Sequence, residues 1–141
     1  MASTTLAPPT EDVEEDYVGH SFWLITGIQL ACSLFFALQV FFVPRRWVTP
    51  MIVAALVCFV AWHHYLYMAE EWEDKKKAPT VLRYMDWFIT VPMQTTCFYL
   101  ILAAATPADK PPVHVSLGLR LGGSSVLMLI FGYMGETDIM D

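Results

Sequence analysis

Four long apolar runs constrain the fold of this chain more than any other feature. They lie at roughly 21–43, 49–68, 80–105 and 113–134, and the charged residues gather between them and at the two ends. A hydrocarbon core about 30 Å thick is crossed by about 20 helical residues. Lipid offers no partner to an unpaired backbone group, so segments that span it must be helices. The sequence therefore predicts four transmembrane helices.

The fold class predicted is an all-α membrane protein, an up-and-down transmembrane helical bundle. The links between the runs are short, so neighbouring helices should be antiparallel. Only 16% of the residues are charged and 56% are hydrophobic, which is unusual for a soluble domain of 141 residues. The fourth run is the weakest, because Arg120 and the Leu-Gly-Gly at 121–123 interrupt it. An acidic tail is expected over 1–20 and the helical region over 21–141.

Composition also excludes several classes of function. The net charge of −6 and the lack of a basic stripe argue against a nucleic-acid partner. Cys32, Cys58 and Cys97 are widely spaced inside apolar runs, so the sequence shows neither a disulfide framework nor metal-ligand spacing. The acidic tail has no apolar core of a signal peptide, so we expect the first span to act as its own insertion signal.

The orientation in the membrane follows only weakly from the Lys and Arg residues of the loops. Arg45 and Arg46 follow the first span, and Lys110 and Arg120 flank or enter the fourth. The lysines at 75–77, between the second and third spans, nearly balance these four. The tail contains neither Lys nor Arg, which favours an extracellular N-terminus.

The third run carries charged side chains where a simple membrane anchor would have leucine. Either charge costs roughly 2.5–3.5 kcal/mol at the bilayer centre. Arg83, Asp86 and Thr90 have the spacing of one helix face, and Gln94 and Cys97 continue the stripe. Such a stripe suggests a path for ions or protons, or a buried ligand site. The alternative is that Arg83 and Asp86 form an ion pair that anchors the helix end.

The second run contains two adjacent histidines, His63 and His64, which point in different directions, so at most one can face the stripe. A single intramembrane histidine is more often a hydrogen-bonded structural residue than a proton carrier. Next to a carboxylate on a neighbouring helix, however, it can bias the protonation of that carboxylate.

These residues bring out a family resemblance. The stretch APTVLRYMDWFITVP at 78–92 closely resembles the third helix of microbial rhodopsins, and of the proteorhodopsin group in particular. The likeness continues through FYLILAAAT at 98–106 and VLMLIFGYMGE at 126–136. It reaches back through WHHYLYM at 62–68 to VGHSFWLITG at 18–27. The resemblance implies a seven-helix retinal protein, with the chromophore held as a protonated Schiff base on a lysine of the last helix.

Matching the family motifs also implies a role for individual residues. Asp86 would be the counterion and primary proton acceptor, His64 its hydrogen-bond partner, and Arg83 a gate toward the outer side. Gln94 matches the position that tunes colour, where glutamine goes with blue absorption. The residues that would line or support the retinal pocket are Tyr84, Trp87, Thr90, Val91, Gln94, Met128 and Gly132. The function implied is that of a photoreceptor and light-driven outward proton pump, not of an enzyme.

Two departures from the family pattern leave other hypotheses open. Cys97 occupies the position where proton-pumping relatives carry a carboxylate donor, and a thiol with a reference pKa of about 8.5 donates poorly at neutral pH. A sensory rhodopsin with a slow photocycle is therefore the second hypothesis. The third is a four-helix membrane protein without a chromophore.

The other departure is the end of the sequence at Asp141, just after the fourth run. Its lysines, at 75–77 and 110, fall in expected loops. The resemblance therefore predicts a fragment with four of the seven helices, lacking the Schiff-base lysine and unable by itself to bind retinal covalently. Membrane lipid and retinal are the expected partners, and a homo-oligomer is left open.

Overall fold

The computed structural model describes residues 11–76, 80–107 and 109–140. Its four α-helices are α1 (Glu11–Gln39), α2 (Arg45–Lys75), α3 (Thr80–Ala105) and α4 (Val115–Met140). Each contains a stretch long and apolar enough to cross a membrane, and the described ranges contain no β-strand. The prediction of an all-α membrane protein with four spans is confirmed.

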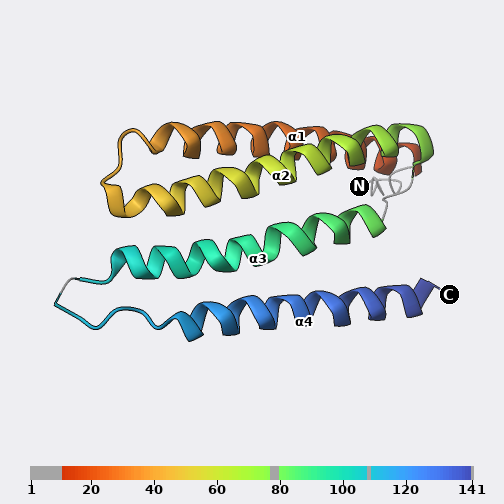
Figure 1. Cartoon of the computed structure of the whole chain (residues 1–141). Coiled ribbons are helices and arrows are strands. Elements are labelled where there is room, and N and C mark those ends of the chain that lie inside the picture. The colour runs from red at the N-terminus through yellow and green to blue at the C-terminus, as the bar shows by residue number, and fades with distance from the viewer. Residues whose placement is uncertain (1–10, 77–79, 108, 141) are drawn as a thin grey trace, which may run out of the picture.

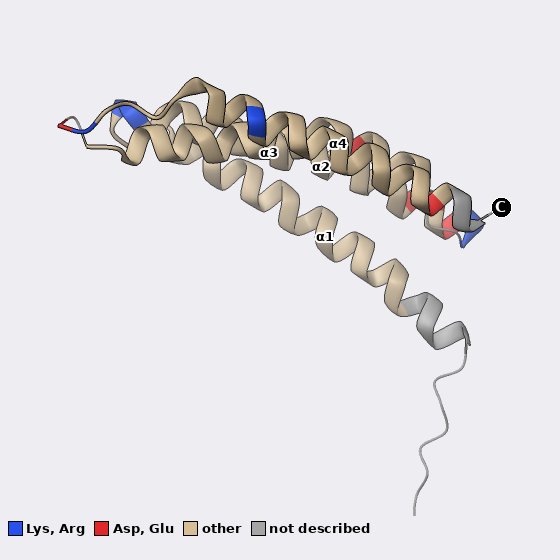
Figure 2. Cartoon of the chain, turned by 90° about the horizontal axis from the view of Figure 1, so that it is seen from below, with Lys and Arg blue, Asp and Glu red and all other residues tan. Residues whose placement is uncertain are grey.

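The four helices lie side by side in chain order, each antiparallel to the next (Figure 1). Among the described residues, α1 contacts α2, α2 contacts α3 and α3 contacts α4, with no contact between other pairs. Figure 2 shows α1 at an angle to the other three helices, although Trp23 still donates a hydrogen bond to Glu73 near the end of α2. The up-and-down order is therefore as expected, but the helices form an open row and not a closed bundle.

The expected helix limits need correction at both ends of α1. It begins at Glu11, so residues 11–20 of the predicted tail are helical, and it ends at Gln39 instead of residue 43. At its C-terminal end, hydrogen-bonded turns over residues 40–43 lead into Pro44. Helical backbone geometry is unfavourable for the residue before a proline, so the helix ends before Pro44.

The limits of α2 and α4 also differ from 49–68 and 113–134. α2 begins directly after Pro44 and continues to Lys75, because its polar last turns are stabilised within the helix by an ion pair between Lys75 and Glu71. The residue that caps its C-terminal end, Lys76, adopts a left-handed conformation with φ of 50°. α4 runs from Val115 to Met140, whereas α3 matches the expected 80–105.

Large apolar side chains cover the outside of the row. Phe41, Leu119 and Phe131 are 82%, 72% and 68% exposed, and every helix presents similar residues. A soluble chain with this surface would associate or aggregate, whereas in a bilayer the same side chains contact lipid. The molecule is therefore an integral, multi-pass membrane protein.

Candidate functional site

The centre of the site is a buried carboxylate on α3 that faces a histidine on α2. Asp86 is only 3% exposed, and its Oδ1 lies 2.9 Å from Nδ1 of His64. An ionised carboxylate only accepts hydrogen bonds, so Nδ1–H of His64 donates to it. The neighbouring His63 is exposed, with its ring nearly perpendicular to that of His64. The antiparallel packing of α2 and α3 thus brings together the two residues on which the sequence prediction centred.

Thr90 is buried one turn after Asp86 on α3, but its hydroxyl does not bond to the side chain of Asp86 or of His64. Its hydroxyl donates to the backbone carbonyl of Asp86 at 2.9 Å, a bond back to its own helix. Asp86, Thr90 and Cys97 are all buried, whereas Gln94 is exposed. The five polar residues of the predicted stripe therefore differ in burial, from the buried Asp86 to the exposed Gln94.

Arg83 pairs with Glu136 of α4 and not with Asp86. Thr80 donates a hydrogen bond to the same Glu136 oxygen at 3.3 Å, and the guanidinium carbon lies 5.5 Å from the centre of the Trp87 ring, a cation–π contact. The alternative of an Arg83–Asp86 ion pair is therefore not what the structure contains. The basic group of α3 is held by α4, while its acidic group is held by α2.

Glu136 is the residue that sequence reasoning missed. Its signal was an acidic side chain near the end of a membrane span, which is costly unless it has a partner. The partner could not be identified from the sequence, because pairing with Arg83 depends on how the antiparallel helices α3 and α4 align.

Tyr84 fills the contact between α3 and α4. It is 7% exposed, and its ring centre lies 5.1 Å from those of both Trp87 and Tyr133. A Cβ atom added to Gly132 would lie 3.3 Å from the Tyr84 hydroxyl. The missing side chain of Gly132 therefore leaves room for Tyr84 between the two helices.

The other residues assigned to the retinal pocket form two stripes on α3 and α4. Trp87 and Val91 are half-buried and four residues apart, and Met128 is 59% exposed, four residues before Gly132. The ion pair joins the two stripes at one end, because Glu136 follows Gly132 by one helical turn. The result is a mostly apolar surface next to the buried Asp86.

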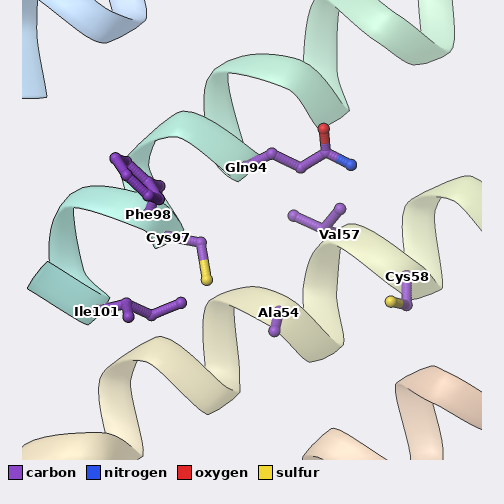
Figure 3. Close-up of a pocket in the computed structure, with 7 residues that line it drawn as sticks. All are labelled: Ala54, Val57, Cys58, Gln94, Cys97, Phe98 and Ile101. Atoms are coloured by element: carbon purple, nitrogen blue, oxygen red, sulfur yellow. The ribbon is translucent and has the colours of Figure 1, made fainter.

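A cavity of about 270 Å³ lies further along α2 and α3, on the opposite side of Asp86 from Arg83 (Figure 3). Gln94 and Cys97 both line it, so the predicted colour-tuning and proton-donor positions share one space. The Cys97 thiol donates to the carbonyl of Pro50 at 3.5 Å. The complete lining consists of Ala54, Val57, Cys58, Gln94, Cys97, Phe98 and Ile101.

Fold and site together define a helical integral membrane protein with a buried histidine–carboxylate pair between two spans. Comparison with known families then gives the particular family. The family model of bacteriorhodopsin-like proteins matches residues 16–140, and this chain belongs to that family. The resemblance to microbial rhodopsins inferred from the sequence is confirmed.

The similar proteins are proteorhodopsins. The chain is 44% identical to a green-light absorbing proteorhodopsin of Gamma-proteobacterium EBAC31A08, over 99% of this chain and 55% of that protein. It is also 44% identical to a blue-light absorbing proteorhodopsin of Gamma-proteobacterium Hot 75m4, over 88% of this chain and 47% of that protein. The chain thus spans about half the length of these relatives.

Two solved structures show the same arrangement of helices. The blue light-absorbing proteorhodopsin from Med12 has a TM-score of 0.73 at 43% identity, over 87% of this chain and 56% of that one. Xanthorhodopsin, described as a light-driven ion pump with dual chromophore, has a TM-score of 0.75 at 27% identity, over 87% of this chain and 52% of that one.

Proposed function

We propose that this chain forms helices one to four of a retinal-binding, light-driven outward proton pump of the proteorhodopsin type. The observation that carries the proposal is the buried pair of Asp86 and His64, 2.9 Å apart. A buried carboxylate inside a membrane span has a high free-energy cost and typically marks a proton path or a counterion. Relatives named as light-absorbing proteorhodopsins and a neighbour described as a light-driven ion pump support the same function.

The residues beside Asp86 fit retinal as a ligand. Trp87, Val91 and Met128 offer apolar and aromatic surface to a long hydrocarbon, while Gln94 supplies one amide in the cavity between α2 and α3. Retinal bound through a lysine outside residues 1–141 would supply light absorption and the transferable proton. The described lysines are Lys75, at the end of α2, and Lys76 and Lys110, outside the helices.

Within this proposal, each residue of the polar pair has a distinct task. His64 holds Oδ1 of Asp86, which leaves Oδ2 as the oxygen that takes up a proton. Arg83 is engaged by Glu136, so within the described chain Asp86 has no arginine or lysine partner. A positive charge placed near Asp86 by a ligand would therefore be the main stabiliser of its ionised form. Loss of that charge would favour protonation of the carboxylate.

A chimaera tests the proposal. Residues 1–141 replace the matching half of the green-light absorbing proteorhodopsin, and retinal is added to cells that express the product. We expect a coloured protein and acidification of the medium in light, abolished by Asp86→Asn with the colour retained. An uncoloured product would overturn retinal binding, whereas colour without any change of pH would overturn pumping.

Cys97 favours a second candidate, a sensory rhodopsin with a slow photocycle. Its buried thiol replaces a carboxylate donor and bonds weakly to the Pro50 carbonyl. If this candidate holds, the chimaera would be coloured but would recover slowly after a flash, and Cys97→Glu would accelerate recovery. Fast recovery with Cys97 in place would eliminate it.

The proposed orientation places the N-terminus outside. Arg45, Arg46 and Lys110 belong to the end of the row where the α1–α2 and α3–α4 links are found, against Lys75 and Lys76 at the other end. Figure 2 shows most of the acidic positions at that other end. An excess of Lys and Arg marks the cytoplasmic side. An epitope tag before residue 11 should then be accessible to antibody in intact spheroplasts, and accessibility only after lysis would reverse the orientation.

A further inference from the structure

A groove lies between α3 and α4. Its volume is about 700 Å³, and α3 contributes Pro92 and Thr96 to its wall. From α4 it is lined by residues that include Gly118, Gly122 and Leu127. None of the residues assigned to the retinal pocket lines it. The groove is therefore separate from the site described above.

Glycines keep the groove open. A Cβ atom added to Gly122 or Gly123 would meet no atom within 4 Å, so both positions border empty space. At Gly118 the same atom would lie 3.2 Å from the Tyr99 ring, which shows that this glycine instead accommodates a side chain of α3. Side chains added at 122 and 123 would thus fill the groove without disturbing the contact between the helices.

An arginine that has no partner among the described residues shares a helix face with two residues that line this groove. Arg120 is exposed, and among the described residues it has neither an ion pair nor a hydrogen bond. Gly123 and Leu127 follow it by three and seven residues, which is the spacing of one helix face. Arg120 lies in the second turn of α4, and its long side chain can reach the headgroup region of a bilayer from there.

We propose that this groove and Arg120 form a binding site for an anionic phospholipid. An acyl chain lies in the apolar groove, and the guanidinium binds the phosphate in a bidentate manner, as it does with other phosphates. Charge complementarity selects an anionic lipid over a second helix, because a phosphate supplies a partner for the Arg120 guanidinium and the apolar face of a helix does not. The site is in the leaflet at the end of the molecule where α3 and α4 are linked.

The test uses the full chain in nanodiscs of phosphatidylcholine that contain phosphatidylglycerol. Native mass spectrometry counts the lipids that stay bound after detergent transfer. We expect wild type to retain phosphatidylglycerol about fivefold better than its mole fraction predicts, the preference expected for one arginine near the headgroups. Arg120→Gln should abolish this preference but leave lipid retention itself, whereas the pair Gly122→Leu and Gly123→Leu should abolish retention at the site.

The matched control is Arg46→Gln, which removes the same charge at the same end of the molecule but on α2, away from the groove. It should leave the preference unchanged, and far-UV circular dichroism should show equal helix content for all variants. An equal loss of preference in Arg46→Gln and Arg120→Gln would overturn the proposal, since it would show a general surface charge effect. Detection of dimers that Gly123→Leu disrupts, with no bound lipid, would assign the groove to a second copy instead.

Discussion

At the residue scale, the site separates two opposite charges that lie one turn apart on α3. Asp86 and His64 could be matched from sequence, because the Arg-Tyr-x-Asp-Trp motif and the paired histidines identify their family positions. The partner of Arg83 could not, since Glu136 is 53 residues away and the pairing depends on helix alignment. The Asp86–His64 pair could thus be predicted from a motif, but the residue that pairs with Arg83 could not.

Replacing His64 should destabilise the chain more than replacing His63. His64→Phe removes the hydrogen bond to a buried carboxylate, which contributes about 1.5–3 kcal/mol when one partner is charged. His63→Phe alters an exposed ring and should change the free energy of unfolding by less than about 0.5 kcal/mol. Unfolding in mixed micelles, followed by circular dichroism, measures both. Equal losses in the two variants would contradict the assignment of His64 as the partner of Asp86.

Glu136→Gln should loosen the attachment of α4 to α3. The Arg83–Glu136 pair is about one third exposed, so its loss should cost no more than about 1 kcal/mol of unfolding free energy. The matched control is Glu71→Gln, which removes an ion pair contained within α2. Only the Glu136 variant should speed hydrogen exchange in the last turns of α4. If both variants changed α4 equally, Glu136 would not hold Arg83 in the way described.

At the element scale, the spans could be predicted because hydrocarbon imposes their length, but their ends could not. The polar turns at the start of α1 and the end of α2 continue the helices beyond the apolar runs. In α2 the ion pair of Lys75 with Glu71 stabilises the last turns, and a pattern of apolar residues gives no sign of such a pair. The third helix was predicted with correct limits because a Pro-Thr sequence and the Thr-Pro at 106–107 mark its two ends.

A side chain added at Gly132 should destabilise the packing of α3 against α4. Gly132→Val places atoms where the Tyr84 hydroxyl lies, 3.3 Å from a Cβ atom, and should cost about 1–3 kcal/mol through overpacking. Gly27→Val on α1 is the control, because a Cβ atom there meets nothing within 4 Å. Midpoints of unfolding in mixed micelles give the comparison. A tolerated Gly132→Val would show that Tyr84 can move aside freely.

At the scale of the whole molecule, the row of helices has two end members. α2 and α3 each pack against two neighbours, whereas α1 contacts only α2 and α4 contacts only α3 within the described chain. The Trp87–Met128 side of α3 and α4 remains open in this row. Sequence patterns predicted the order of the helices but not the open row, because apolar residues that face lipid and those that face other helices look alike in a membrane span.

A polypeptide that carries the remaining half of the green-light absorbing proteorhodopsin should bind to this open side. Co-reconstitution in vesicles should slow the amide hydrogen exchange of α3 and α4, because burial of their open stripes suppresses local opening. α1, which contacts only α2 within the described chain, should exchange as before. An unrelated membrane polypeptide of equal length is the control. Uniform protection of all four helices, or none, would show that the Trp87–Met128 surface does not receive the partner.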